Sequence, residues 1–355
     1  MNDSTMASPI RHLRLYFQDE NAKIPQSLSA VEQIGRSLWL AGDESRSVER
    51  LVGMDEANFK DHRSFDLLQY FPMLVTQDDE IDLEGLCWDK TSSRLWLTGS
   101  HSWRRKQPKP DSTDEEAFRK LRTVDRQINR YLLGSIQLEP ETAHPDIWAP
   151  VADSGRALRF SEKGNALTDH LRDDPLFKPF MNIPSKDNGF DVEGIAVKDG
   201  NVMIGLRGPV LRGWASILHC RFESGAQHEL IPLSLGTRPY LHHILDLDGL
   251  GVRDLCVIDD DLLILAGPTM SLDGPMRVFR WHDPFGLTHD THVDGARLER
   301  LFAVPWGERL DHAEGITVFE RDDRPPRLLV VYDSPDPGRL HGGSFFEADL
   351  FRLPE

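Results

Sequence analysis

The sequence predicts an all-β protein, a single β-propeller of five or six blades with a helical insertion. A short motif with a charged residue before an apolar run recurs along the chain. Each copy continues into a polar turn and a second apolar run, which is the pattern of a β-hairpin. The copies are about 60 residues apart or more, and self-similarity at such a period is typical of repeat architectures. The clearest copies begin at Asp82-Leu-Glu84-Gly85, Asp191-Val-Glu193-Gly194, Val252-Arg253-Asp254 and Asp311-His312-Ala-Glu314-Gly315.

Each unit offers further candidate strands after its motif. The second runs span 94–98, 201–205, 262–266 and 327–332, and third runs span 130–138, 216–222, 276–281 and 345–353. A weaker first copy aligns Trp39 with Trp96, which places Ser27 where other units have glutamate. The N-terminal run 11–17 is predicted to pair with the last unit, because closing the ring removes exposed strand edges.

The repeat covers most of the 355 residues, so we expect one domain over 1–355. The gap between Glu84 and Glu193 is too long for one blade. Part of it, about 101–130, reads as a helical insertion in which Ser112 and Glu115 form a capping box. The irregular segment 143–189 holds one short strand candidate at 157–160. It either hides a degenerate blade or decorates the propeller, so the blade count stays at five or six.

Composition narrows the classes of partner. The chain has 41 basic and 58 acidic residues, a net charge of −17, which argues against nucleic acid or an anionic membrane as the main partner. Cys87, Cys220 and Cys256 lie in apolar runs and are expected to be buried free thiols of a reducing compartment. No apolar stretch has the length of a signal peptide or a membrane span, so a cytoplasmic location is expected. The oligomeric state stays open.

The repeat also predicts where a site would lie. In a propeller the first strand of each blade lines the channel, and a hairpin returns the second strand to the same rim. The starts of the first strands and the ends of the second strands should therefore meet at one mouth. The residues placed there are Glu84, Glu193, Arg253 and Glu314, with Asp43, Glu44, Ser100, His101, Arg207, Pro268, Thr269, Asp333 and Ser334.

Three carboxylates near one axis repel one another and require neutralisation. One interpretation is a divalent cation, Ca²⁺ or Mg²⁺, held by Glu84, Glu193 and Glu314, since hard oxygen ligands suit these ions. Another is that the glutamates fasten the ring and that Arg253, which replaces glutamate in one unit, neutralises them. Protonation is the third. The sequence leaves these interpretations open.

Three further residues are candidates for chemistry. Arg207 and Arg212 lie in the glycine-rich run 205–214 and offer forked donors for a phosphate or carboxylate. The alternative is that Arg207 pairs with the ring glutamates. His312 is the acid/base candidate because its ordinary pKa is near neutrality, although a lone histidine can also be a hydrogen-bonding fixture. No nucleophile elbow, zinc-protease helix or dinucleotide fingerprint is present.

The arginine-glycine-proline run at 207–209 and the repeated glutamate-glycine starts resemble a bacterial family catalogued as domain of unknown function 3616. The resemblance spans about residue 28 to the C-terminus and implies a fold but no activity. The glutamate-glycine repeat is also similar to phytase-like propellers and, more loosely, to calcium-dependent lactonase propellers. This likeness implies a metal site at Glu84, Glu193 and Glu314, a set from which Arg253 departs.

Two hypotheses for function follow. The first is a divalent-metal-dependent hydrolase of a small anionic ester, a phosphoester above all. Glu84, Glu193 and Glu314 would hold the metal, Arg207 and Arg212 would bind the anion, and His312 would transfer protons. The second is a non-catalytic propeller that binds a ligand or a partner protein on the same face, since the fold does not choose between the two.

Overall fold

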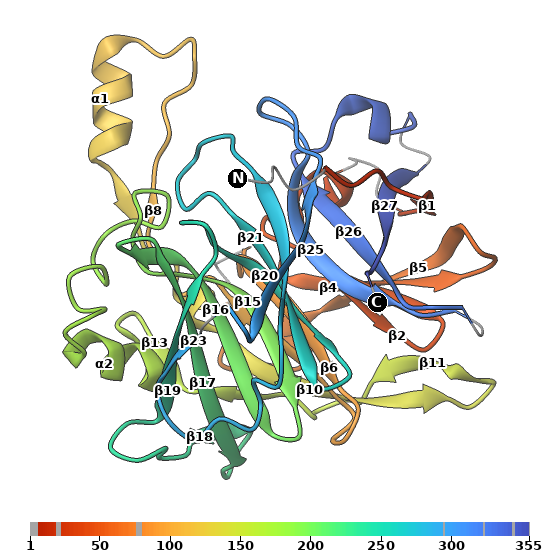
Figure 1. Cartoon of the computed structure of the whole chain (residues 1–355), viewed down its shortest axis with the longest axis horizontal. Helices are drawn as coiled ribbons and strands as arrows, with labels where there is room; N and C mark the ends of the chain where they lie inside the picture. The colour runs from red at the N-terminus through yellow and green to blue at the C-terminus, as the bar shows by residue number, and fades with distance from the viewer. Residues whose placement is uncertain are drawn as a thin grey trace.

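The computed structural model describes residues 6–18, 23–75, 80–293, 295–321, 324–342 and 345–354. It is an all-β, propeller-like protein whose sheets are arranged around a central axis (Figure 1). The inner strands are β2 (Leu28–Ile34), β6 (Leu83–Asp89), β15 (Asp191–Lys198), β20 (Gly251–Ile258) and β25 (His312–Phe319). They contact one another in this cyclic order, and β25 returns to β2, so they enclose a channel.

Each inner strand opens an antiparallel meander. Unit I continues with β3 (Ser37–Gly42), β4 (Ser47–Gly53) and β5 (Asn58–Asp66). Unit II continues with β7 (Arg94–Gly99), β10 (Leu133–Glu141), β11 (His144–Pro150) and β12 (Arg156–Leu158). Unit III continues with β16 (Asn201–Leu211), β17 (Trp214–Ser224), β18 (Glu229–Pro232) and β19 (Tyr240–Asp246). Unit IV continues with β21 (Asp261–Gly267), β22 (Met276–Trp281) and β24 (Leu298–Val304), and unit V with β26 (Arg327–Asp333) and β27 (Phe346–Arg352).

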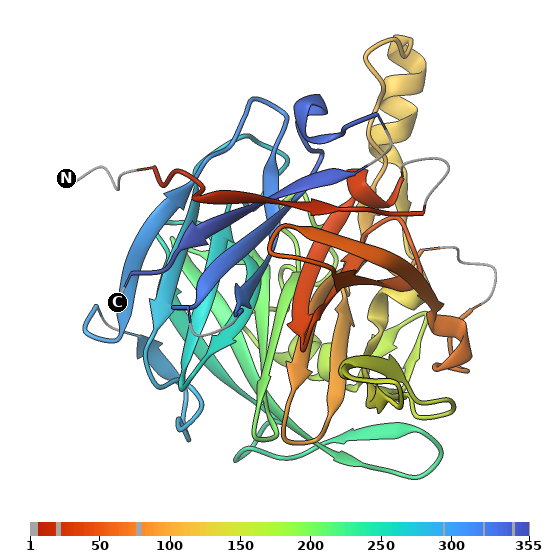
Figure 2. The same cartoon turned by 90° about the vertical axis from the view of Figure 1, so that its right-hand side faces the viewer.

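The N-terminal strand β1 (Arg11–Leu15) closes the ring as the sequence predicted. It pairs antiparallel with β27, from Arg11 opposite Leu350 to Leu15 opposite Phe346. It also pairs in parallel with β5 of unit I, so units V and I share one continuous sheet. Figure 2 shows this strand lying across the blue C-terminal strands. The outer edge of the last unit is thereby covered.

The hydrophobic core is divided among the interfaces between neighbouring units. Trp39 of unit I packs in one cluster with Leu97 of unit II, and Trp96 of unit II packs with Ile204 of unit III. Further clusters join unit III to unit IV, and unit IV to units V and I. Fully burying a large apolar side chain contributes roughly 1.5–3 kcal/mol, so these interfaces hold the sheets face to face.

Two segments depart from the meanders. The predicted insertion contains α1 (Asp114–Arg122), which stands away from the sheets, with β8 (Arg104–Arg105) and β9 (Val124–Asp125) at its base (Figures 1 and 2). Its capping box is Thr113 with Glu116, one residue later than the predicted Ser112 with Glu115. The segment 143–189 contributes β11 and β12 but no inner strand, and also holds β13 (Phe160–Ser161), β14 (Gly164–Asn165) and α2 (Ala166–Asp173).

The remaining elements are short. β23 (Thr291–Val293) pairs in parallel with β19. The described 3₁₀ helices are η1 (Ile24–Gln26), η2 (Leu67–Gln69), η3 (Ile128–Tyr131) and η4 (Pro337–Arg339). Cys87, Cys220 and Cys256 are buried free thiols, as predicted. Over the described ranges, no helix combines the length and the apolar character that crossing a membrane requires.

Candidate functional site

A β-bulge interrupts every inner strand at the same place, near its beginning. In β6 the register passes from Leu83 to Gly85 and leaves Glu84 unpaired. A bulge bends the strand and re-aims the extra side chain. The five residues left out of the ladders are Ser29, Glu84, Glu193, Arg253 and Glu314. The alignment of Trp39 with Trp96 placed Ser27 at the glutamate position of the first copy. The bulge residue is Ser29, because the true correspondence between the first unit and the second is shifted by two residues from that alignment.

The glycine after the bulge lets neighbouring inner strands approach closely. A Cβ on Gly85 would lie 3.0 Å from the backbone nitrogen of Ile195, and one on Gly315 would lie 2.9 Å from the Cα of Ala30. Real Cβ atoms rarely come so near to a backbone. The glutamate-glycine motif therefore has two structural parts: the first residue is directed by the bulge, and the second makes room for the next strand.

Arginines hold the carboxylates of three units together. Arg253 Nε lies 3.1 Å from Glu193 Oε2 in an ion pair, and its Nη2 contacts Glu314 Oε1. Arg207 forms an ion pair from Nη1 to Glu193 Oε1 at 2.6 Å, and its Nη2 contacts Asp191. All five side chains are at most 13% exposed. We call Asp191, Glu193, Arg207, Arg253 and Glu314 the ion-pair ring.

The ion-pair ring contains three carboxyl groups and two guanidinium groups. Burial raises the pKa of Asp191 to about 7, although Arg207 acts in the opposite direction. Burial alone would lower the pKa of Arg207, but the surrounding carboxylates outweigh it and hold that pKa above its ordinary value. Its guanidinium therefore stays charged. Both oxygens of Glu193 are engaged by guanidinium groups, so this carboxylate is not free to accept another cation. The predicted alternative, in which Arg207 and Arg253 neutralise the glutamates, matches this geometry.

A second buried pair lies beside the ring and was missed by sequence reasoning. Arg130, in η3 before β10, forms an ion pair with Asp82 at 2.6 Å and donates hydrogen bonds to the hydroxyl groups of Ser100 and Ser102 at 3.5 and 3.4 Å. The neighbouring His101 is buried and contacts the side-chain amide of Asn165. Burial lowers the pKa of His101 to about 4, so it is a neutral structural residue at pH 7.

Glu84 and Asp43 at this mouth form no ion pair among the described residues, although the charge of Lys186 acts on Asp43. Burial, followed by the charges of Glu193 and Asp82, raises the pKa of Glu84 well above its ordinary value. Burial, followed by Asp82 and Asp333, raises the pKa of Asp43 to about 7. One oxygen of Asp43 is buried without a hydrogen-bond partner. Within the described ranges, the carboxyl group of Asp333 accepts a hydrogen bond from Ser334 at 3.2 Å and forms no ion pair. If all of these groups were ionised they would form an excess of negative charge, which a proton or a cation relieves.

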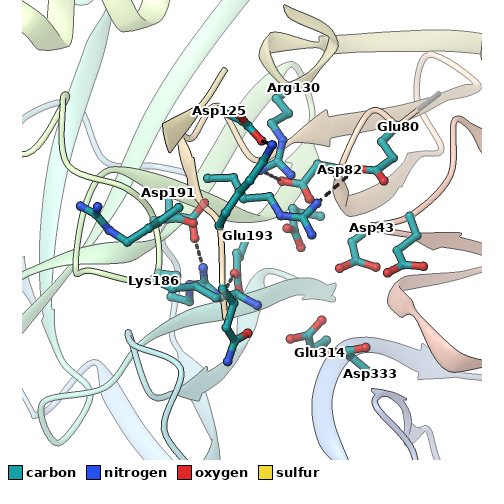
Figure 3. Close-up of a pocket in the computed structure, with 18 of the residues that line it drawn as sticks. Asp43, Glu80, Asp82, Asp125, Arg130, Lys186, Asp191, Glu193, Glu314 and Asp333 are labelled. Carbon is teal, nitrogen blue, oxygen red and sulfur yellow. Dashed lines mark hydrogen bonds and ion pairs between the residues drawn. The ribbon is translucent and has the colours of Figure 1, made fainter. Parts of the chain in front are cut away.

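The mouth opens into a cavity of about 440 Å³ (Figure 3). Its floor contains the unpaired carboxylates and part of the ion-pair ring, and its wall contains cations of the insertion. Arg104 and Lys106 pair with Glu80 and Asp125 at 3.4 and 3.1 Å, and these ion pairs are largely exposed. Lys120 of α1 also lines the wall. A negative floor therefore faces a positive wall across a space of ligand size.

The predicted site residues separate into two groups. Glu84, Glu193, Glu314 and Arg207 line this cavity, together with the predicted Asp43, Glu44 and Asp333. Arg212 does not: it is exposed at the tip of the hairpin between β16 and β17. His312 is also outside the lining, and its Nε2 lies 3.3 Å from Asp273. Across the described ranges, no group of three or more histidine, cysteine or acidic side chains is arranged as a metal site.

The fold and this charged channel mouth define a propeller-like protein with a polar axial cavity. Residues 27–349 match the model of a family described as "Protein of unknown function (DUF3616)", which covers most of the chain. The chain therefore belongs to that family, as the sequence resemblance implied. None of the curated proteins matches the chain.

Solved structures with a similar course of the chain share about one residue in ten. Glutaminyl cyclase of Myxococcus xanthus is 11% identical at a TM-score of 0.41, covering 99% of this chain and 98% of its own. The PQQ-bound aldose sugar dehydrogenase of Streptomyces coelicolor is 10% identical at 0.39, covering 97% of each. The catalytic domain of a Coprinopsis cinerea α-L-arabinofuranosidase is 10% identical at 0.42, covering 98% of each.

Proposed function

We propose that the chain is a five-bladed propeller that binds a small molecule with both a cationic and an anionic group at the channel mouth of Figure 3. The cyclic contacts of the five inner strands support the blade count. The observation that carries the binding proposal is that Asp43 and Glu84 form no ion pair among the described residues, whereas each acidic side chain of the ion-pair ring pairs with an arginine.

The cationic group of the ligand belongs against Asp43 and Glu84. Burial and then neighbouring charges raise both pKa values and favour the protonated carboxyl groups, whereas a bound ammonium would favour the carboxylates and lower those pKa values. The anionic group belongs against the wall. Exposed ion pairs such as Arg104 with Glu80 contribute little, so their arginine and lysine members can exchange partners for a phosphate or carboxylate.

The test uses phosphoethanolamine as the probe, in isothermal titration calorimetry at low salt. Ethanolamine and inorganic phosphate serve as single-charge controls. We expect phosphoethanolamine to bind at least tenfold more tightly than either control, because only it engages both floor and wall. Glu84→Gln should weaken its binding about tenfold, whereas Glu308→Gln, a substitution on an exposed loop, should leave it unchanged.

Equal binding of all three compounds, or none by any, would overturn the proposal. Binding that survives Glu84→Gln unchanged would place the ligand elsewhere on the protein. Thermal unfolding of each variant checks that the loss is not a loss of fold. A salt titration adds a second readout, since screening should weaken the anionic contact more than the buried cationic one.

Metal-assisted hydrolysis of a phosphoester is a second candidate, for which the oxygen donors outside the ion-pair ring are the potential ligands, although the described residues form no ready-made metal cluster. Asp43, Glu84 and Asp333 are hard ligands of the kind that Ca²⁺ and Mg²⁺ prefer, whereas Glu193 is engaged by two arginines. A bound ion would supply a Lewis acid and an activated water. This candidate uses neither Arg212 nor His312, since both lie outside the cavity lining.

Calcium and magnesium titrations distinguish the two candidates. If a divalent cation is the natural occupant, Ca²⁺ should bind in the absence of any organic ligand, and EDTA should lower the melting temperature of the calcium-loaded protein. Turnover of 4-nitrophenyl phosphate that depends on the ion and is lost in Glu84→Gln would support hydrolysis. Calcium binding without turnover of a broad ester panel would reject the hydrolase and keep a cation site.

A further inference from the structure

The opposite mouth of the channel contains a second cavity of about 730 Å³. The ends of all five inner strands line it, together with their hairpin turns. It therefore lies at the other end of the inner strands from the β-bulges and shares no residue with the first cavity. Its volume is within the range of small-molecule sites, and its lining is mixed polar and apolar, as such sites usually are.

Near this mouth, side chains at one equivalent position of the inner strands hydrogen-bond the backbone of the neighbouring inner strand. The Sγ atom of Cys87 accepts a hydrogen bond from the backbone N–H of Val197 at 3.1 Å, and the Sγ atom of Cys256 accepts one from Val318 at 3.2 Å. Thr317 accepts one from Gln33 at 3.2 Å. Each of these residues lies three positions after the bulge of its strand. A neutral side chain is therefore sufficient for the fastening role.

Unit I has a glutamate, Glu32, at the equivalent position. Its carboxyl group faces the backbone N–H of Trp88, as the fastening role requires. That role does not explain the charge, because cysteine, threonine and alanine fill the same position in the other units. Glu32 as a whole residue is partly exposed, and it is among the residues that line the cavity.

Aromatic side chains provide the apolar part of the cavity. The indole rings of Trp88 and Trp148 meet edge to face, with centroids 5.0 Å apart. Trp148 comes from β11, whose hairpin with β10 brings it beside the mouth. Both rings are partly exposed to the cavity, and indole faces attract cations.

The charge of the lining selects the sign of the ligand. Five carboxylates face two lysines, and Lys198 is already held by Asp260 at 2.5 Å. Lys90 is the remaining lysine of the lining. The carboxylates are Glu32, Asp89, Asp199, Asp259 and Glu320. An anion would be repelled here, whereas a cation with an apolar body meets a matching surface.

We infer that the second mouth is a binding site for an aromatic amine, whose ammonium group pairs with Glu32 and whose ring packs against Trp88 and Trp148. This site is independent of the ligand proposed for the first mouth. It takes a ligand with one cationic group and no anionic group, whereas the ligand proposed for the first cavity also carries an anionic group for the basic wall.

The titration of Glu32 gives this site a signature. Burial raises its pKa to about 8, and Lys90 acts in the opposite direction. The thiols of Cys87 and Cys256 and the buried carboxyl group of Asp254 are its other titratable neighbours. At pH 7 most Glu32 is protonated. Pairing with an ammonium requires the carboxylate, so binding releases a proton and affinity rises between pH 7 and 8.5.

The experiment compares 2-phenylethylamine, 2-phenylethanol and phenylacetate by calorimetry on the full chain. We expect the amine to bind at least tenfold more tightly than the alcohol, and phenylacetate to give no measurable binding. The heat of amine binding should depend on the ionisation enthalpy of the buffer, in the direction of proton release. Glu32→Gln should remove both the amine preference and the proton release, while Glu308→Gln should change neither.

Equal affinity for the amine and the alcohol would overturn the inference, as would amine binding that weakens with rising pH. The ligand series on the unaltered protein remains decisive even if Glu32→Gln fails to fold. Failure here is distinguishable from failure at the first mouth, because phosphoethanolamine and 2-phenylethylamine report on separate cavities. A competition titration in which one displaces the other would contradict the assignment of two sites.

Discussion

The two mouths of the channel are formed by opposite ends of the same inner strands, yet their side chains differ in charge and in aromatic content. At the first mouth, β-bulges direct four charged side chains and one serine toward the axis, and arginines bind most of the carboxylates. At the second mouth, the residues three positions after each bulge are neutral except for Glu32. Tryptophan side chains line this cavity, whereas arginine and lysine side chains line the first. The repeated sequence motif gives the inner strands the same backbone course. Differences at single equivalent positions of the repeat then determine the charge and polarity of each mouth.

Arg253 shows what one substitution in the repeat achieves. It occupies a position that is glutamate in three other units, and it joins the glutamates on either side. A fourth carboxylate there would add repulsion, whereas the guanidinium removes it. The exchange of one residue converts a repulsive cluster into the ion-pair ring, and it leaves Glu84 as the bulge carboxylate without a partner in the described structure.

The largest effect is expected from breaking the ion-pair ring. Arg253→Met leaves Glu193 and Glu314 buried with one guanidinium fewer, and removing one partner of a buried ion pair typically costs about 3–5 kcal/mol. We expect a loss of that size in the free energy of unfolding at pH 7.5, measured by urea denaturation. Arg212→Met, at an exposed hairpin tip, should change it by less than about 0.5 kcal/mol. Similar losses in both variants would contradict the role of Arg253.

A smaller effect tests the close approach of the inner strands. Gly315→Ala places a Cβ 2.9 Å from the Cα of Ala30, and overpacking of this kind costs about 1–3 kcal/mol. Gly286→Ala is the matched control, because no atom lies within 4 Å of the added Cβ. The measurement is again urea denaturation. If the two variants are equally stable, the glycine of the motif is not needed for strand contact.

The smallest expected effect is on the pH dependence of the free energy of unfolding, to which Asp43 at the first mouth and Glu32 at the second contribute at different pH values. The pKa of Asp43 is raised to about 7 and that of Glu32 to about 8, so the folded protein binds protons that the unfolded chain has released. Stability from these groups is present at low pH and is lost as pH rises through those values. Between pH 7 and 8.5, the free energy of unfolding should decrease by about 1–2 kcal/mol less in Glu32→Gln than in the unaltered protein. Asp43→Asn should reduce this decrease by a smaller amount. An unchanged slope in Glu32→Gln would show that its pKa is not raised.

The repeat made the fold predictable. Hydrophobic runs and turn residues located the inner strands and their partners, and the strand at Arg11–Leu15 was correctly paired with the last unit. The motif also placed Glu84, Glu193, Glu314 and Arg207 at one mouth. These features could be predicted because hydrophobic runs, turn residues and the motif recur along the chain and can be recognised without knowing which distant segments are in contact.

The misses have the opposite origin, since they depend on contacts between distant segments. Arg130 gave no signal because its role arises only where η3 passes beside Asp82. α2 was missed because the segment around it reads as proline-rich loop. Glu32 lies in the weakest copy of the repeat, and its place among Cys87, Cys256 and Thr317 appears only when the bulges set the register.

The most direct test of the account is the side-chain ¹³C titration of Glu84 by NMR, with and without phosphoethanolamine, assigned by comparison with Glu84→Gln. The account predicts that Glu84 titrates well above the ordinary range of glutamate in the free protein. It predicts that the bound ammonium lowers that pKa. An ordinary pKa in the free protein, or one that the ligand leaves unchanged, would contradict the claim that this mouth holds an unpaired carboxylate for a cationic group.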